Sequence, residues 1–283
     1  MPDLRRLASL LALFALALAC TTPPAPDRAL EPRRIVSLTP ALTEILFALD
    51  LGDRVVGVTE YCDTPAEAKT RPKVGGYVNP SVEAVIALRP DLVVVSPGPG
   101  NRDAVQAMAR TGLNVAVVPA ETLPETFVAI ESVSEAAGAP ERGRELVERL
   151  RARIDAVARK VASRPRVRVL FSVQVDPIIA AGRGTLPSQL LEAAGGLNVV
   201  EAERYPKLGV ESVVQLAPQV VLQSRMDMTQ RDGSAERAAW MRWSAIPAIA
   251  RGHLVILPDD ASLRPGPRVA DAVEQLAAIL HPE

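Results

Sequence analysis

The stretch YVNPSVEAVIALRPDLVVVS at residues 77–96 returns later in the chain as YPKLGVESVVQLAPQVVLQS at residues 205–224. At a constant offset of 128 positions (205 − 77), both versions begin with a tyrosine and carry a glutamate six residues further on. In each version an apolar stripe at helical spacing leads through a proline into a β-branched run, which predicts a short helix, a turn and a buried strand. The repeat therefore predicts two related lobes built on one plan.

Within the first copy, Asn79 is a good N-cap and Pro80 suits the first position of a helix. Val82, Val85 and Ile86 then follow at spacings that predict a buried stripe. The sequence thus predicts that the helix begins next to Pro80.

Other short apolar runs predict further strands of a parallel sheet, because they are continuous rather than alternating, as in strands covered on both faces. The candidate strands are residues 35–38, 55–58, 92–95, 115–118, 167–173, 220–222 and 254–257. Residues 141–162 interrupt this series with a long amphipathic helix. The predicted fold class is α/β, with an N-terminal lobe (34–140), a linking helix (141–163) and a C-terminal lobe (164–283).

Size and charge limit the functions that the chain can have. With 283 residues, 48% of them hydrophobic, the chain is long enough for two cores. The formal net charge is −1, and no long run of Lys or Arg is present. Nucleic acid is therefore excluded as a partner, since phosphate binding requires a basic face.

The N-terminus is typical of an export signal. Two arginines precede an apolar run at residues 7–19, which is shorter than the roughly 20 residues of a transmembrane helix. The run ends in LALAC, so residues 1–19 are predicted to be a lipoprotein signal peptide and Cys20 the lipid anchor. Residues 20–33 are Pro-rich and predict a tether. We therefore expect a protein on the periplasmic side of the cell envelope, anchored to a membrane through Cys20; the alternative is a plain secretory signal.

The mature domain then has one thiol, Cys62, so it can form no intrachain disulfide. Whether Cys62 contacts a ligand stays open. The histidines, His253 and His281, are too few for a His-rich metal site. His253 also precedes its strand, which places it at the wrong sheet edge for a catalytic triad. We predict no catalytic residues and no resident metal.

Ligands of open α/β sheets bind outside the carboxyl ends of the strands. Residues that follow a predicted strand are Thr39, Pro40, Glu60, Tyr61, Ser96, Pro97, Gly98, Gln174, Val175, Asp176, Gln223, Ser224, Arg225, Asp259 and Asp260. They come from both lobes, so a cleft between the lobes is predicted.

Aromatic residues make up only 3% of the chain, so their positions are informative. Tyr61, Tyr77 and Tyr205 either shield the lobe edges or clamp a large flat apolar ligand. Trp240 and Trp243 fall in a helical segment and are predicted to pack in the core or on the lobe surface.

Glu83 and Glu211 occupy first helical turns, where the helix dipole alone favours a carboxylate. Their matched positions in the two copies favour a second interpretation, in which they form a docking surface for a two-fold partner.

Three stretches carry a resemblance to a known family. They are RIVSLTPALTEILFALDLGDRVVGVTEYCDTP at residues 34–65, KVGGYVNPSVEAVIALRPDLVVV at residues 73–95 and RPGPR at residues 264–268. The chain resembles the substrate-binding proteins of ABC importers for siderophores, haem and cobalamin, with the cobalamin binders nearest. That resemblance implies a class III periplasmic binding protein, in which one long rigid helix joins two Rossmann-like lobes that hold the ligand between them.

The resemblance also implies roles for individual residues. Ligand contacts are expected from Tyr61, Tyr77, Ser96, Tyr205, Asp260 and Arg264, and contacts with the two permease subunits from Glu83 and Glu211. Ser96 stands where the cobalamin binders have a tryptophan. The expected cargo is cobalamin or a related corrinoid, transported rather than held as a cofactor, by a monomeric protein.

Several alternatives stay open. Haem or a ferric siderophore is the alternative cargo, and Arg225, Arg264 and Arg268 are the cations that favour an anionic one. A reductase with a metal cluster is a different class, but it would need more cysteines than Cys62. A lipoprotein that binds only another protein is a third class.

Overall fold

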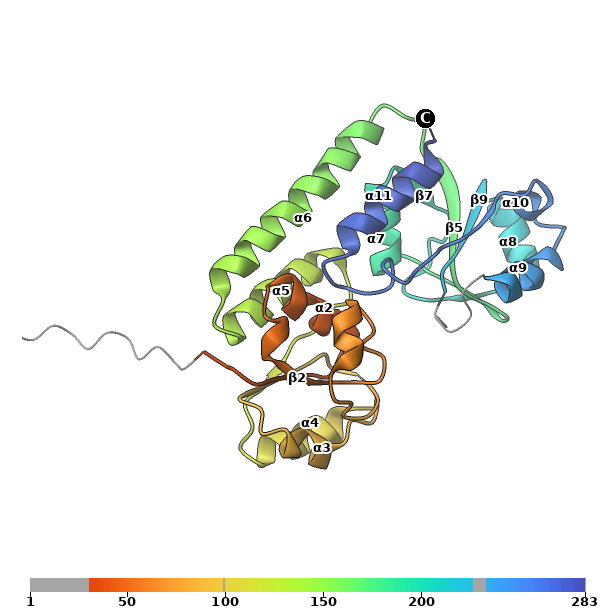
Figure 1. The fold of residues 1–283 in the computed structure, drawn as a ribbon. Helices are drawn as coiled ribbons and strands as arrows, with labels where there is room; N and C mark the ends of the chain where they lie inside the picture. Colours follow the sequence, from red (N-terminus) through yellow and green to blue (C-terminus); the bar gives the residue numbers. More distant parts are fainter. Residues whose placement is uncertain (1–30, 99, 226–232, 283) are drawn as a thin grey trace, which may run out of the picture. The chain divides into compact units, whose positions relative to one another are not determined.

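A computed structural model describes residues 31–98, 100–225 and 233–282, and the residues from Pro32 onward pack as one compact unit (Figure 1). The helices are α2 (Pro40–Ala48), α3 (Val82–Ala87), α4 (Arg102–Arg110), α5 (Leu123–Ala136), α6 (Pro140–Val161), α7 (Leu186–Ala193), α8 (Val210–Leu216), α9 (Ser234–Met241), α10 (Pro247–Ala250) and α11 (Val269–Leu280), with the 3-10 turns η1 (Gly52–Arg54) and η2 (Ala66–Thr70). The strands are β1 (Ile35–Ser37), β2 (Val55–Val58), β3 (Leu92–Val95), β4 (Val115–Val117), β5 (Val167–Val175), β6 (Ile178–Ala180), β7 (Gly196–Asn198), β8 (Lys207–Leu208), β9 (Val220–Gln223) and β10 (Leu254–Ile256).

The N-terminal lobe is built on a parallel sheet of strand order β2-β1-β3-β4. Its central strand β3 is buried on both faces, as its continuous apolar sequence predicts. Leu92 and Val94 pack with α2 and α5, whereas Val93 and Val95 pack with Val85 of α3 and Met108 of α4. Figure 1 shows the two helix layers on opposite faces of this sheet.

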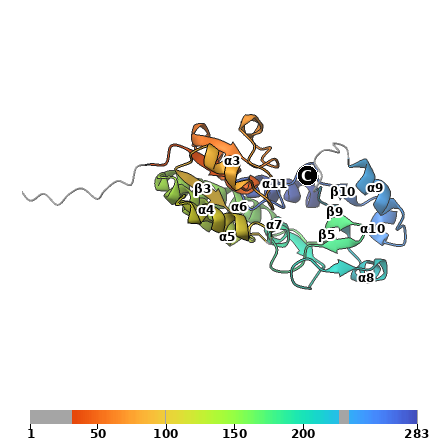
Figure 2. The same ribbon diagram turned by 90° about the horizontal axis from the view of Figure 1, so that it is seen from below.

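The C-terminal lobe repeats this parallel order as β7-β5-β9-β10 and adds two antiparallel strands, β6 and β8. Figure 2 shows β5, β9 and β10 of this sheet. The first part of β5 pairs with β7, and its last part pairs with β6. Three of these strands, β6, β7 and β8, have two or three residues each and were not predicted, because so short a stretch shows no periodicity.

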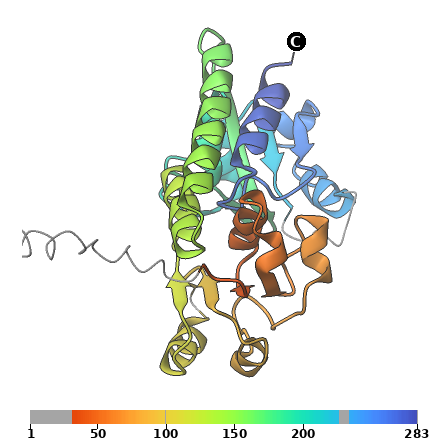
Figure 3. The same ribbon diagram turned by 60° about the vertical axis from the view of Figure 1, so that its left-hand side comes forward.

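The helix α6 connects the two lobes and matches the predicted helix within one residue at each end. It lies against α5 and α11, and Figure 3 shows it in green beside the dark blue α11. The guanidinium of Arg153 on α6 donates two hydrogen bonds to Glu274 of α11, at 2.9 and 2.7 Å, and a third to Asp271. The lobe boundaries themselves stay a prediction.

A single hydrophobic cluster runs through both lobes. It joins Leu42 and Ile45 of α2 with Ile154 of α6, Leu190 of α7 and Val273 of α11. Since a close-packed interior resists deformation, this shared core restrains the lobes from moving as separate bodies.

The repeat found in the sequence is also present in the structure. The helices α3 and α8 begin at equivalent positions of the two copies, and the strands β3 and β9 coincide completely. One prediction inside the repeat was wrong: Ser81, not Asn79, is the N-cap of α3, where its Oγ accepts from the Ala84 amide at 3.2 Å. The Ser81 amide donates to Val74 O at 2.8 Å, and this bond holds the chain extended past Pro80 and delays the helix.

A second prediction in this unit also fails. Ile86 was expected in the buried stripe of α3, but its side chain is 41% exposed. The six-residue helix buries Val85 fully and leaves the face of Ile86 without a covering element.

Candidate ligand-binding cleft

A cavity of about 460 Å³ opens at the carboxyl ends of the N-terminal strands. Its lining comes from the segments after β1, β2, β3 and β4 and from the segment before α11, and consists of Thr39, Pro40, Ala41, Tyr61, Tyr77, Val78, Ser96, Pro97, Pro119, Ala120, Glu121, Leu263, Arg264 and Pro265. The rule that ligands bind at the carboxyl ends of strands thus locates this cavity.

A second hollow of about 240 Å³ continues it toward the C-terminal lobe. The two share Ala120, Glu121, Leu263 and Pro265, and the second adds Gly184, Thr185, Leu186, Arg204 and Tyr205. We call the two together the cleft. Its volume falls within the range of small-molecule sites, roughly 300–1,000 Å³.

The three predicted tyrosines all line the cleft. Tyr61 is 62% exposed and Tyr205 is 45% exposed, whereas Tyr77 is half-buried and its hydroxyl donates to Pro97 O at 3.3 Å. Burial raises the pKa of Tyr77 above its ordinary value, and the charge of Glu121 adds to this. Burial also raises the pKa of Tyr205, although the charge of Arg204 opposes the shift. Both phenols are therefore neutral at physiological pH.

Ser96 lines the cleft in a turn that its neighbours hold rigidly. Its amide donates to Thr39 Oγ1 at 3.0 Å, and its carbonyl accepts from the buried amide of Asn101 at 3.0 Å. Asn101 also accepts from the Gly98 amide at 3.0 Å. The ring of Tyr77 packs so closely on Gly98 that a Cβ there would lie 2.6 Å from the tyrosine hydroxyl.

Among the described residues of the cleft, sequence reasoning missed two charged ones, Glu121 and Arg204, whose side chains form an ion pair at 2.9 Å. Glu121 follows β4, so the carboxyl-end rule applied to residues 115–118 would have found it. Arg204 lies in the loop before the repeated tyrosine, and no local pattern marks it. Its partner is 83 positions away, so only the packing of the two lobes brings them together.

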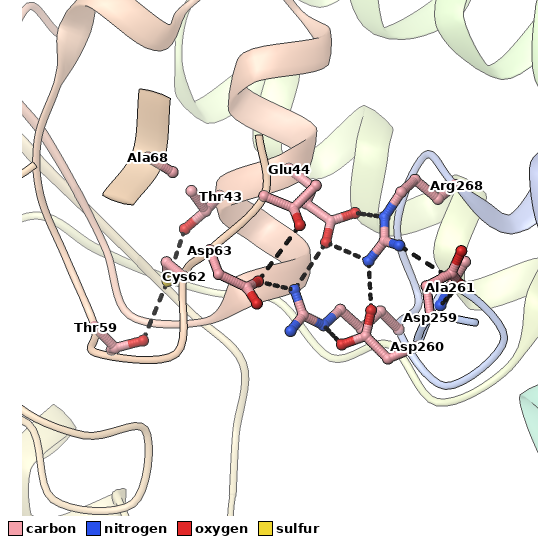
Figure 4. Close-up of polar contacts among 12 residues, drawn as sticks. Thr43, Glu44, Thr59, Cys62, Asp63, Ala68, Asp259, Asp260, Ala261 and Arg268 are labelled. Carbon is pink, nitrogen blue, oxygen red and sulfur yellow. Dashed lines mark hydrogen bonds and ion pairs between the residues drawn. The ribbon is translucent and has the colours of Figure 1, made fainter. Parts of the chain in front are cut away.

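The segment before α11 brings Arg264 and Arg268 against the buried Glu44 of the other lobe, and Figure 4 shows Arg268 beside Glu44. Glu44 of α2, which is 2% exposed, accepts from Arg264 at 3.0 Å and from Arg268 at 2.9 Å. Three further carboxylates contact these arginines. Asp63 lies 2.8 Å from Arg264, and Asp259 lies 3.8 Å from Arg268. Asp260 lies 2.5 Å from Arg264 and 2.7 Å from Arg268. We call these six residues the arginine cluster.

The cluster determines what Arg264 and Asp260 can do. Burial acts to lower the pKa of Arg264, but the charge of Asp260 and the other carboxylates outweighs it and raises the pKa. Burial acts to raise the pKa of Asp63, but the hydrogen bond and charge of Arg264 lower it below its ordinary value. Arg264 lines the cleft as an already paired cation, and Asp260 lies behind it and does not line the cavity.

Among the described residues, none that directly follows β5 or β9 lines the cleft. Gln223, Ser224 and Arg225 are buried, and Gln223 Oε1 accepts from the indole of the buried Trp240 at 2.8 Å. Gln174 and Asp176 lie where β5 turns into β6. The last residues of β5 pair with the antiparallel strand β6, which the sequence analysis did not predict.

Cys62 is buried and lies outside the cleft, where its Sγ contacts the hydroxyls of Thr43 and Thr59 at 3.1 Å each (Figure 4). His253 precedes β10, as predicted, and its Nδ1 lies 3.1 Å from Gln219 O. Among the described residues, no group of three or more His, Cys, Asp or Glu is placed to hold a metal ion.

Glu83 and Glu211 lie in the first turns of α3 and α8 and are both exposed. Neither lines the cleft. The predicted signal peptide and Cys20 lie outside the described residues. Within the described part of the chain, no helix has the length and apolar character needed to cross a membrane.

The sequence of residues 35–261 matches the family described as periplasmic binding protein. The chain belongs to the periplasmic binding protein family. Its sequence is 30% identical over 270 residues to the vitamin B12-binding protein of Vibrio cholerae serotype O1, covering 93% of this chain and 96% of that protein. It is 32% identical over 263 residues to an uncharacterized ABC transporter substrate-binding lipoprotein of Bacillus subtilis, covering 89% and 81%.

Solved structures agree with this membership. The crystal structure of the periplasmic vitamin B12-binding protein of Vibrio cholerae is similar with a TM-score of 0.75 at 30% identity, covering 88% of this chain and 97% of that one. The periplasmic haem-binding protein of Roseiflexus sp. RS-1 is similar with a TM-score of 0.78 at 28% identity, covering 88% and 98%.

These similarities confirm the predicted fold class, two α/β lobes with parallel sheets as in the class III periplasmic binding proteins. Periplasmic binding proteins are transport components without catalytic activity, so membership of the family also confirms that the chain is not an enzyme. It is a periplasmic substrate-binding protein of the group that includes vitamin B12-binding and haem-binding proteins.

Proposed function

We propose that this periplasmic binding protein captures cobalamin or a related corrinoid and delivers it to an ABC importer. The observation that carries the proposal is the chemistry of the cleft, where the rings of Tyr61, Tyr77 and Tyr205 surround an opening without an uncompensated cation. Aromatic rings bury large areas against a flat apolar ligand. The similarity to vitamin B12-binding proteins supports the same choice.

The charged residues of the cleft favour a corrinoid over an anionic cargo. In the described residues, the charged side chains that line the cleft are Glu121, Arg204 and Arg264, and both arginines contact carboxylates. The arginine cluster and the Glu121–Arg204 pair together contain five carboxylates and three guanidinium groups, a net charge of −2. Such a site suits corrinoids, whose side chains are amides, better than anionic ferric siderophores.

Haem is the second candidate, because solved haem-binding proteins are similar in structure and a tyrosine can ligate haem iron. The surroundings of the tyrosines disfavour it, since burial raises the pKa of Tyr77 and Tyr205 and so opposes the tyrosinate form. Haem also carries two carboxylates, whereas both arginines among the described residues of the cleft, Arg204 and Arg264, already contact carboxylates of the protein.

Calorimetric titration of the purified protein tests the proposal. We expect cyanocobalamin to bind with a nanomolar dissociation constant, which corresponds to about −12 kcal/mol. Haemin, titrated in parallel, is expected to bind at least a hundredfold more weakly. Binding of haemin without binding of cyanocobalamin at micromolar concentrations would refute the proposal.

We further propose that Cys20 carries a lipid that anchors the protein on the periplasmic side of a membrane, where it acts as a monomer. The LALAC sequence supports this, and a similar protein of Bacillus subtilis is described as a lipoprotein. In a native host, C20A is expected to move the protein from the membrane fraction to the soluble fraction. An unchanged fractionation would contradict the anchor.

Delivery to the permease is proposed to use Glu83 and Glu211, which present carboxylates from equivalent turns of the two lobes. Charge pairs at an exposed interface rim mainly control orientation and association rate. The double variant E83R/E211R is expected to abolish uptake of labelled cyanocobalamin by cells and to leave its affinity unchanged. An equal loss of ligand affinity would refute the docking role.

A further inference from the structure

Glu121 is the residue at which the hollows of this region meet. It lines the 460 Å³ cavity, the 240 Å³ hollow toward the C-terminal lobe and a further groove of about 740 Å³ beside α4. Its charge acts on the phenol groups of both Tyr77 and Tyr205, which belong to different lobes. A ligand held between these rings therefore lies next to the carboxylate of Glu121.

The backbone of Glu121 is held in place. Its amide donates to Glu125 Oε2 at 2.8 Å, and Thr122 caps α5 by accepting from the Glu125 amide at 3.3 Å. Two residues further on, the Leu123 amide donates to Gln189 Oε1 of α7 at 2.7 Å, which ties this turn to the C-terminal lobe. The position of Glu121 is thus determined by the junction of the lobes.

The side chain, in contrast, is held only weakly. Glu121 is 64% exposed and Arg204 is 68% exposed, and pairs of this kind contribute about 0–1 kcal/mol in water. A ligand that fills the cleft removes water from both groups. In the ligand-filled cleft the carboxylate of Glu121 stays neutralised, because Arg204 supplies one positive charge to balance its one negative charge.

The arginines that line the cleft are already paired with carboxylates of the protein, and this limits which ligands the cleft can bind. Arg204 can neutralise one carboxylate, and it already pairs with that of Glu121. Arg264 already contacts Glu44, Asp63 and Asp260. Among the described residues of the cleft, a carboxylate brought by the ligand would therefore find no unpaired cation, and its desolvation would be costly, whereas an amide can donate to Glu121 and leave the ion balance intact.

We infer that Glu121 is a specificity-determining residue, which excludes ligands that carry carboxylates and admits amide-bearing ones. The inference rests on the proposed function, since it assumes that the cleft between the tyrosines is the ligand site. It assigns to Glu121 a selective role rather than a large share of the affinity.

The test compares E121Q with wild type by titration with haemin, which has two propionate groups, and with dicyanocobinamide, whose side chains are amides. E121Q removes the competing carboxylate and frees Arg204, so haemin is expected to bind about tenfold more tightly. The affinity for dicyanocobinamide is expected to change less than threefold. R204Q is expected to weaken haemin binding about tenfold, because it leaves the carboxylate of Glu121 without its cation next to the carboxylates of the ligand.

Three controls isolate the charge. E121D is expected to keep the wild-type preference, and E135Q, on the exposed side of α5, is expected to change neither affinity. Raising NaCl from 50 to 500 mM is expected to reduce the gain of E121Q for haemin, since salt screens exposed charges. A purely structural role of Glu121 would not produce this salt dependence.

The outcomes distinguish the two proposals. If wild type binds the corrinoid and E121Q alters both affinities by the same factor, the selective role of Glu121 is wrong and the proposed function stands. If wild type binds haemin and no corrinoid, the proposed function itself is wrong.

Discussion

Arg89 and Ala217 occupy equivalent positions of the repeat and share one backbone conformation, with φ of 44° and 43°. Both follow the repeated helix and precede a proline. Their surroundings match as well: Arg34 donates to Leu88 O at 2.7 Å, and Arg168 donates to Leu216 O at 2.7 Å. The two copies therefore share a left-handed residue and an arginine that donates to a carbonyl at the C-terminal end of the repeated helix.

Left-handed backbone at a residue with a side chain costs about 1–2 kcal/mol, and glycine avoids that cost. We expect A217G to raise the free energy of unfolding by about 0.5–1 kcal/mol, after allowance for the greater freedom of glycine in the unfolded chain. Urea denaturation followed by circular dichroism measures this change. A156G, at an exposed position inside α6, should lower the same quantity by about 1 kcal/mol. A loss of stability in A217G would contradict the strain argument.

The arginine cluster predicts a large effect at Glu44. E44Q removes the buried carboxylate shared by Arg264 and Arg268, and breaking a buried ion pair costs about 3 kcal/mol. The same denaturation experiment measures it, with E141Q on the exposed surface of α6 as a control expected to change stability by less than 1 kcal/mol. A loss at Glu44 no larger than that of the control would show that the cluster does not hold the lobes together.

The lowered pKa of Asp63 predicts that the free energy of unfolding depends on pH. Arg264 holds the pKa of Asp63 below its unfolded value, so the folded state favours the ionised carboxylate. The contribution is complete above the unfolded pKa of about 3.9 and is lost as the pH falls through the lower folded pKa. The stability difference between wild type and D63N is therefore expected to be constant from pH 7 to about pH 5 and to shrink below about pH 4. A difference that grows on acidification would contradict this sign.

Because Gly98 contacts Tyr77, we expect a larger residue at position 98 to weaken ligand binding in the cleft. A methyl group at position 98 would lie 2.6 Å from the hydroxyl and 3.0 Å from Cζ of Tyr77, so the ring must move. We expect G98A to weaken cyanocobalamin binding about tenfold with little change in stability. Adding Y77F removes the closest contact and is expected to restore part of the affinity. Unchanged affinity in G98A would indicate that Tyr77 does not contact the ligand.

Much of this fold was predictable because its signals are local. The strand β3 and the helix α6 were predicted from continuous and helical apolar patterns, and the repeat predicted α8 and β9. The N-cap at Ser81 was missed because a backbone contact with Val74, seven residues earlier, decides where α3 begins. The short strands β6 and β7 depend on β5 as a partner, β8 depends on β6, and none of the three shows a pattern of its own.

The sequence by itself determined the two-lobed plan, the family and which tyrosines are candidates for the cleft. Periodicity, turn chemistry and motif spacing depend only on residues that are close together in the sequence. Only the tertiary structure decided the electrostatics of the site. Glu121 meets Arg204, and Arg264 meets Glu44, because packing of the lobes brings together side chains that are far apart in the chain. Whether an arginine is a free anion receptor or a paired cation depends on those neighbours, and the structure shows Arg264 as a paired cation.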